Sequence, residues 1–320
     1  LGANEAPPAI ISMFLGDELT EILKSLESGA AYHGPDKHPM EIGVTVLPHF
    51  PKDTTDRNRT SPFAFTGNKF EFRMLGSAFS IAGPNIVLNT VVAESLRQFA
   101  DQLEASADFQ ADLAALIRKT IREHRRIVFN GNSYSDEWVA EAEGRGLSNR
   151  RSTVEALPAF VEPKSIEVFT RHHVFTETEL RSRYEILLEN YAKTLRIEAL
   201  TMVDMVRRDV IPACVGYQNE LLSLLQAKKA CFKSGGALEE QLCAKIDGLC
   251  GCLMSKLEAL EDALLGAPES ASPLDEADYT RRRVFGSMAE LRLVVDELET
   301  LVSKKYWTLP TYADLLYSVQ

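Results

Sequence analysis

The residues best suited to chemistry lie between Arg57 and Ser77, in the stretch RNRTSPFAFTGNKFEFRMLGS. Phenylalanines alternate with other residues on both sides of the sequence TGN, which is typical of a β-hairpin. Successive side chains of a strand point to opposite faces. If Phe70, Phe72 and Met74 face the core, Glu71 and Arg73 must lie side by side on the other face.

A carboxylate next to a guanidinium can hold a divalent metal ion and an anion as neighbours. Phosphoryl transfer needs this combination, because arginines and carboxylate-bound metal ions place positive charge on the phosphate oxygens. Arginine suits the task because its planar fork grips a phosphate or carboxylate with two bonds. The alternative interpretation is a solvated basic loop followed by an exposed strand face with one surface ion pair.

Composition excludes several other classes of function. The chain has 320 residues, of which 45% are hydrophobic, so it can bury a core and hold two domains, or one domain with a large appendage. A net charge of −11 disfavours nucleic-acid binding, and a local basic cluster then points to a small anion. No long apolar run or signal segment is present, so we expect a cytoplasmic protein without membrane contact. The odd number of cysteines, 5, predicts free thiols and neither a disulfide framework nor a zinc site.

The N-terminal half mixes helices, strands and loops. Apolar spacing predicts a helix from Phe14 to Leu26 with Gly29 as its stop, and EIGVTVLPHF predicts a strand. Two helical stretches, LNTVVAESLRQFADQLE and ADLAALIRKTIREHRRIVF, precede a break at NGNSYSDEW. Residues 146–164 contain two prolines and predict an irregular connection.

The C-terminal part predicts three long amphipathic helices. The first follows a capping box at Thr176 and Glu179 and ends at Pro212. The second stripe is closed by Gly266, and the third begins at Ser272. Similar lengths and short connections predict an antiparallel bundle.

Two motifs in this order carry a family resemblance. LGANEAPPAIIS, followed by NRTSPFAFTGNKFEFR, resembles the C-terminal part of a glutamine synthetase, and FAFTGN with a long helical tail resembles the type III class. The fold class implied is α+β, predominantly helical, with the end of a catalytic sheet domain of antiparallel strands before the bundle. The expected domains are residues 1–100, the C-terminal part of the catalytic domain; 101–165, a helical and irregular connection; and 166–320, the antiparallel helical bundle.

The resemblance also implies roles for individual residues. Arg59 matches the arginine that stabilises the transferring phosphoryl group, and Lys69 matches a basic contact to the ATP phosphates. Glu71 matches a ligand of the second divalent-metal site. Arg73 matches the arginine that faces the glutamyl substrate and its phosphorylated intermediate. Glu5 matches the flap carboxylate that closes the site and takes a proton from ammonium.

The chain departs from the family at one nucleotide contact. Many members carry a further arginine five residues beyond Arg59, where this chain has Ala64. That contact must come from elsewhere or be absent. Arg57 is a possible substitute with nothing in the sequence to support it.

The resemblance implies an ATP-dependent, Mg²⁺- or Mn²⁺-requiring glutamate–ammonia ligase that makes glutamine through γ-glutamyl phosphate. The chain begins without methionine, so we expect a fragment that is inactive alone. By resemblance the enzyme is a dodecamer of rings whose active sites form between neighbouring subunits. Two alternatives stay open: a ligase that joins glutamate to an organic amine, and a non-catalytic assembly module built on the bundle.

Overall fold

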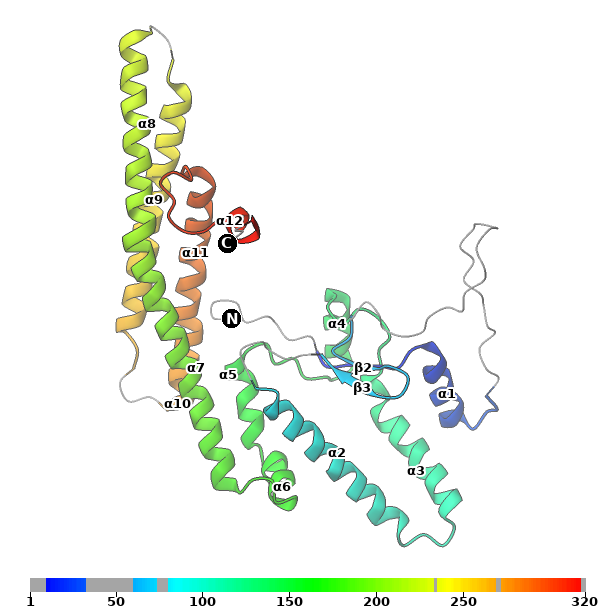
Figure 1. The fold of residues 1–320 in the computed structure, drawn as a ribbon. Coiled ribbons are helices and arrows are strands. Elements are labelled where there is room, and N and C mark those ends of the chain that lie inside the picture. Colours follow the sequence, from blue (N-terminus) through cyan, green and yellow to red (C-terminus); the bar gives the residue numbers. More distant parts are fainter. Residues whose placement is uncertain (1–9, 33–59, 74–79, 233–234, 269–271, 318–320) are drawn as a thin grey trace, which may run out of the picture. The chain divides into compact units, whose positions relative to one another are not determined.

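The structure is a computed structural model that describes residues 10–32, 60–73, 80–232, 235–268 and 272–317 (Figure 1). The chain divides into two compact units between Leu180 and Arg181. The first unit contains a small sheet, and the other regular elements of the described residues are helical. The fold is therefore α+β and predominantly helical, as the sequence predicts. The three domain ranges expected from the sequence stay a prediction.

The first unit combines the sheet with short and medium helices. Its elements are β1 (Met13–Phe14), α1 (Asp17–Ser28), β2 (Phe63–Phe65), β3 (Phe70–Phe72), α2 (Ala82–Leu103), α3 (Phe109–His124), α4 (Asp136–Gly144), α5 (Thr153–Ala156) and α6 (Pro163–Arg171). The break predicted at NGNSYSDEW is confirmed, because it separates α3 from α4. The connection expected to be irregular contains α5 and a 3₁₀ turn at Leu157–Val161. The strand predicted in EIGVTVLPHF lies outside the described residues.

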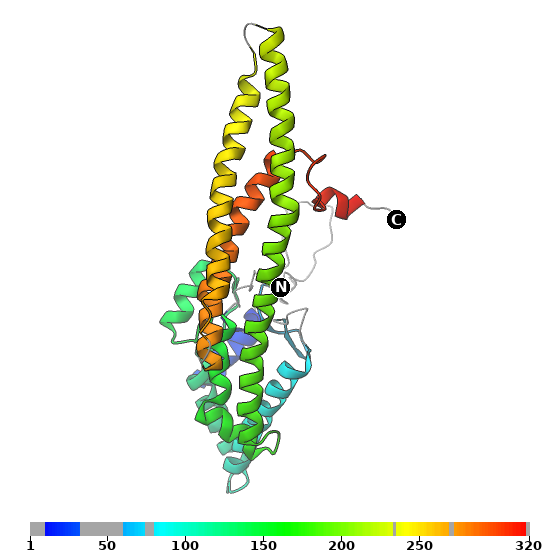
Figure 2. The ribbon, with the colours of Figure 1, turned by 90° about the vertical axis from the view of Figure 1, so that its left-hand side faces the viewer.

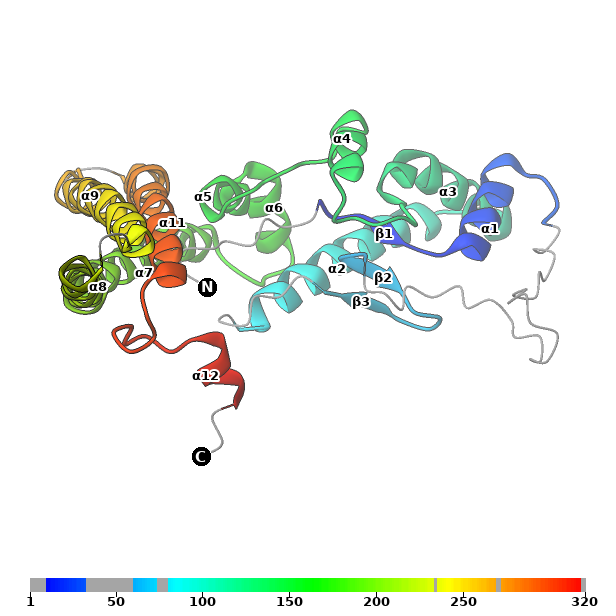
Figure 3. The same ribbon diagram turned by 90° about the horizontal axis from the view of Figure 1, so that it is seen from above.

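The sheet has the order β1-β2-β3 and mixed direction. β2 and β3 pair antiparallel as the predicted hairpin, whereas β1 pairs with β2 in parallel (Figure 3). Val128 adds a parallel bridge to Met13, and the N–H of Phe129 donates to the Met13 carbonyl at 3.0 Å. The segment after α3 therefore supports the outer side of β1.

The first helix begins later than its apolar spacing predicts. Phe14 lies in β1, and α1 starts only at Asp17. The N–H groups of Leu15 and Gly16 donate to Asn130 Oδ1, each at 3.1 Å, which holds the backbone out of the helix. Gly29 ends α1 with φ of 74°, and this left-handed cap confirms the predicted stop.

The second unit is a bundle of long helices. Its elements are α7 (Glu177–Met205, whose first turn precedes the unit), α8 (Ile211–Cys231), α9 (Ala237–Leu265), α10 (Pro273–Tyr279), α11 (Gly286–Leu301) and α12 (Tyr312–Tyr317). The capping box is confirmed, since the Thr176 N–H donates to Glu179 Oε2 at 2.8 Å and the Glu179 N–H donates to Thr176 Oγ1 at 3.3 Å. Within the described residues, no helix is long and apolar enough to cross a membrane.

The first long helix does not end at Pro212. A π-helical turn at Val206–Val210 joins α7 to α8, and Pro212 lies in the first turn of α8. The N–H of Ile211 donates to the Val206 carbonyl, so the helix is wider here. Proline lacks an N–H and clashes with the preceding turn, and the π turn accommodates both defects without ending the helix.

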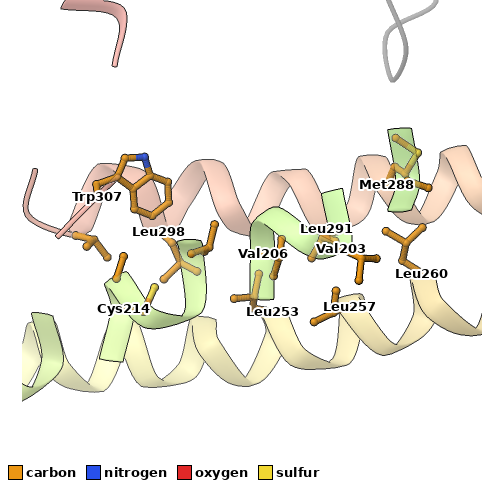
Figure 4. Packing of buried hydrophobic residues seen from close by; sticks show 14 of the residues in the cluster. Val203, Val206, Cys214, Leu253, Leu257, Leu260, Met288, Leu291, Leu298 and Trp307 are labelled. Atoms are coloured by element: carbon orange, nitrogen blue, oxygen red, sulfur yellow. The ribbon is translucent and has the colours of Figure 1, made fainter. Parts of the chain in front are cut away.

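The bundle core lies between α7–α8, α9 and α11, which run side by side (Figure 2). Most of its buried residues come from the predicted stripes, whereas Cys214 and Leu221 come from α8 and Trp307 follows α11. Ten of them are labelled in Figure 4: Val203, Val206, Cys214, Leu253, Leu257, Leu260, Met288, Leu291, Leu298 and Trp307. Most of the predicted apolar stripes are therefore confirmed as core, and Trp307 packs in the same core. All five cysteines are free thiols.

Candidate active site

The β2–β3 hairpin places the charged residues of the predicted site. Ala64 pairs with Glu71 in antiparallel register, between two pairs of phenylalanines. At the turn, the Thr66 N–H donates to the Lys69 carbonyl at 2.8 Å, and Gly67 has φ of 95°, which suits glycine. The hairpin predicted from the alternating phenylalanines is confirmed.

Lys69, Glu71 and Arg73 lie on one face of the hairpin. Arg73 donates from Nε at 3.3 Å and from Nη2 at 3.0 Å to Glu71 Oε2. Lys69 Nζ lies 3.6 Å from Glu71 Oε1. The predicted side-by-side arrangement of Glu71 and Arg73 is confirmed, and Lys69 joins it, so one carboxylate is flanked by two cations. The roles of these residues stay a prediction.

The three side chains differ in how firmly the fold holds them. The side chain of Arg73 is 15% exposed, that of Glu71 38% and that of Lys69 66%. The Arg73 N–H also donates to the Pro62 carbonyl at 2.8 Å, which fixes its backbone to the start of β2. Arg73 is therefore a fixed group, and Lys69 a solvent-facing one that can follow a ligand.

The phenylalanine face is not the buried side of the hairpin. Phe70 is 48% exposed, whereas Ala64, on the face of Glu71, is fully buried. The Phe70 ring stacks on Phe63 at 5.4 Å and packs on Phe65 at 5.2 Å between centroids. The expectation that Phe70 faces the core is wrong, because the hairpin rings pack on one another. Met74 lies outside the described residues.

The two cations make Glu71 more acidic than a free glutamate. The hydrogen bonds from Arg73 are the largest cause of the lowered Glu71 pKa, and the charges of Arg73 and Lys69 add to it. Partial burial opposes this effect with a smaller rise. Glu71 is therefore an ionised oxygen donor at neutral pH.

Replacing Arg73 by glutamine is expected to raise the pKa of Glu71 toward its ordinary value, because it removes the largest cause of the lowering. Since the folded-state pKa is below the unfolded one, the pair stabilises the fold above the unfolded pKa. This stabilisation disappears as pH falls through the folded-state pKa. An NMR titration of the Glu71 carboxyl carbon measures the shift. Lys69→Gln is the matched control with a smaller rise, and an unchanged midpoint in Arg73→Gln would refute the assignment.

Two predicted site residues, Glu5 and Arg59, lie outside the described residues. Thr60, the next residue after Arg59, is described, and its carbonyl accepts a hydrogen bond from the Ser133 N–H at 2.9 Å. At Ala64, where the resemblance leads us to expect an arginine in many members, the side chain is fully buried. The missing nucleotide contact therefore has no replacement at that position.

The residues that hold the segments before β1 and β2 were not predicted from the sequence. Ser12 and Ser133 share a buried hydrogen bond of 2.7 Å across 121 residues of chain. Trp138 donates from Nε1 to the Ile10 carbonyl at 3.2 Å and is fully buried, so it packs beneath the segment before β1. The available signal was the polar motif NGNSYSDEW, whose serines and asparagines can form such hydrogen bonds.

The hairpin face fits part of a nucleotide and metal site. Mg²⁺ in such sites is held by one or two carboxylates with substrate phosphates and water, and Glu71 supplies one ionised carboxylate. Lys69 and Arg73 supply the positive charge that phosphate oxygens require. Within the described residues, no group of three or more histidine, cysteine or acidic side chains could hold a metal. Further ligands must therefore come from other residues or from the substrate.

A second charged cluster surrounds Glu94, which is 6% exposed in α2. Glu94 accepts hydrogen bonds from Arg97 at 2.9 Å, Gln98 at 2.7 Å and Arg171 at 2.7 Å, and its Oε2 lies 2.8 Å from His172 Nε2. The bonds from Arg97 and then Gln98 lower the pKa of Glu94 the most. With both oxygens occupied, Glu94 ties α2 to α6, and this cluster is structural.

Comparison with known proteins shows the same family along the whole chain. The family described as glutamine synthetase C-terminal domain matches residues 112–229. A glutamine synthetase of Butyrivibrio fibrisolvens is 40% identical over 330 residues, covering 100% of this chain. Over the length it spans, this chain belongs to the glutamine synthetase family. The family predicted from the hairpin and N-terminal motifs is therefore confirmed.

Two further glutamine synthetases match the chain, and one of them is named as type 3, in agreement with the type III resemblance. A type-3 glutamine synthetase of Dictyostelium discoideum is 38% identical over 99% of the chain, and a glutamine synthetase of Bacteroides fragilis is 33% identical over 99%. The chain spans 46%, 44% and 45% of the lengths of these three relatives. The matched C-terminal domain runs from α3 into α8, so it includes Ser133, Trp138 and the first long helix of the bundle.

Proposed function

We propose that this chain is part of an ATP-dependent glutamate–ammonia ligase that forms glutamine through γ-glutamyl phosphate. The cluster of Lys69, Glu71 and Arg73 carries the proposal, because it combines a metal-binding carboxylate with two anion-binding cations on one strand face, and the side chains of Lys69 and Glu71 reach solvent. The identity of 40% to a glutamine synthetase over the entire chain supports it.

The chemistry requires activation of a poor leaving group. A γ-carboxylate oxygen of glutamate attacks the γ-phosphorus of ATP, the bond to the β–γ bridging oxygen breaks, and ADP leaves. The nitrogen lone pair of ammonia then attacks the acyl carbon and expels phosphate. A bound Mg²⁺ or Mn²⁺ supplies Lewis-acid stabilisation of the phosphate charge.

Glu71 couples the binding of the metal ion to the binding of the nucleotide phosphates in this proposal. Its oxygens contact Arg73 and Lys69 without ligand, and these contacts can be exchanged for a divalent cation. Lys69 and Arg73 can then contact phosphate oxygens, where Arg73 stabilises the charge that develops during transfer. Nucleotide and metal would therefore bind together better than either binds alone.

The remaining roles follow the family pattern. Arg59 stabilises the transferring phosphoryl group and contacts the nucleotide, and Glu5 takes the proton from ammonium and shields the intermediate from water. We also propose that the chain alone is inactive, because it spans less than half of each relative. The assembly proposed for the whole cytoplasmic enzyme is a ring-based homo-oligomer.

The test is an assay of the full-length protein that contains this chain. With ATP, Mg²⁺, glutamate and ammonium, phosphate release is expected to depend on all four and to match the glutamine formed. Replacing ammonium by methylamine or ethylamine tests acceptor specificity in the same assay. Phosphate release without glutamine, or a higher kcat/KM for an alkylamine, would overturn the proposal.

A further inference from the structure

We infer that Ser133 is a positioning residue for the hairpin face that carries Lys69, Glu71 and Arg73. The inference that it affects catalysis rests on the proposed function. The placement itself rests on contacts that join Ser133 to both segments that lead into the sheet.

The first contact fixes the segment before β1. Ser133 Oγ and Ser12 Oγ are 2.7 Å apart, and the two residues are 1% and 0% exposed. Ser12 immediately precedes β1, whose Met13 pairs with Phe63 of β2. We therefore expect a change at Ser133 to alter the position of β1, the strand that pairs with the hairpin strand β2.

The second contact fixes the segment before β2. The Ser133 N–H donates to the Thr60 carbonyl at 2.9 Å. Two residues later, the Pro62 carbonyl accepts the Arg73 N–H at 2.8 Å. Ser133 is thus linked to the Arg73 backbone through two main-chain hydrogen bonds and the short segment from Thr60 to Pro62.

The loop that carries Ser133 has a rigid base. Asn130 holds two backbone N–H groups before α1, and the Ser135 hydroxyl caps α4 by accepting the Trp138 N–H. The Trp138 ring stacks on Phe129 with centroids 4.0 Å apart, and Arg145 lies over both rings. These contacts hold the loop between α3 and α4 in place, so it can fix the positions of the segments before β1 and β2.

Loss of the Ser133 hydroxyl has a direct consequence. Ser12 keeps a buried hydroxyl without its partner, so the segment before β1 relaxes toward another arrangement, and β2 shifts with it because it pairs with β1. Small errors in the position of catalytic groups reduce rate strongly even when the mutated residue does not touch substrate. The expected result is a fall in kcat of roughly 10- to 100-fold with little change in the KM for glutamate.

The experiment compares Ser133→Ala, Ser12→Ala and Ser152→Ala in the full-length protein. Ser152 is the matched control, because it is a buried serine in the same unit whose hydroxyl only caps α5. Hydrogen exchange of the Thr66 and Arg73 amides reports the hairpin directly, and the kinetics of glutamine synthesis at varied glutamate report kcat and KM. Faster exchange and lower kcat are expected in Ser133→Ala and Ser12→Ala, and neither in Ser152→Ala.

The outcomes separate this inference from the proposed function. An inactive wild-type protein overturns the proposed function, while the exchange measurement still decides whether Ser133 positions the hairpin. Unchanged exchange in Ser133→Ala and Ser12→Ala overturns the inference. An active protein whose kcat is equal in Ser133→Ala and Ser152→Ala also overturns it, because a purely structural role lowers stability without selecting the hairpin.

Discussion

Replacing Glu71 by alanine in the full-length protein is expected to lower kcat for glutamine synthesis by roughly 100-fold or more. The carboxylate is the only metal-type ligand that the described residues place on the hairpin face, between Lys69 and Arg73. Its loss should also raise the Mg²⁺ or Mn²⁺ concentration needed for half-maximal activity. Activity measured over a metal titration tests both effects.

Arg73→Ala separates the role of the cation from that of the carboxylate. It removes a positive charge beside Glu71, so the metal concentration needed for half-maximal activity should not rise. The value of kcat should still fall, because the phosphorylated intermediate loses its contact with the Arg73 guanidinium. Glu21→Ala is a suitable control, since Glu21 is an exposed carboxylate paired with Lys24 at 2.7 Å in the same unit. Near-normal turnover in Glu71→Ala, or a raised metal requirement in Arg73→Ala, would contradict the assigned roles.

Leu291→Ala is expected to lower the free energy of unfolding of the bundle by ~3 kcal/mol. Leu291 is 0% exposed in the core between the long helices, and truncation leaves a cavity there. Leu293, two residues along α11, is 67% exposed, so Leu293→Ala should change stability by no more than about 0.5 kcal/mol.

The measurement is urea-induced unfolding of the 320-residue chain followed by tryptophan fluorescence. Both variants are made in a Trp138→Phe background, so that the signal comes from Trp307, which packs in the same core. Equal midpoints for the two leucine variants would show that the described core does not hold the bundle together.

The hairpin was predictable because its signals are local. A period of two and the TGN turn place Glu71 and Arg73 on one face without any knowledge of the remaining fold. The bundle stripes and the capping box at Thr176 were predictable for the same reason: a helix positions residues three and four apart on one side.

The errors arose where distant contacts decide the structure. Asn130 holds the backbone before α1, so the apolar spacing that begins at Phe14 does not continue as a helix. A π-helical turn accommodates Pro212, so the helix continues through it. This turn cannot be recognised from the spacing of apolar residues in the sequence. The Ser12–Ser133 bond joins residues 121 apart, and the exposed ring of Phe70 depends on which surfaces reach the hairpin. Neither can be read from local spacing.

The most direct test of the central claim is a crystal structure of the full-length protein with ADP and Mn²⁺, with the metal located by anomalous diffraction. The account predicts a Mn²⁺ ion coordinated by a Glu71 carboxylate oxygen, with Lys69 or Arg73 in hydrogen-bond contact with a phosphate. A fully occupied nucleotide and metal site that none of these three side chains contacts would contradict it.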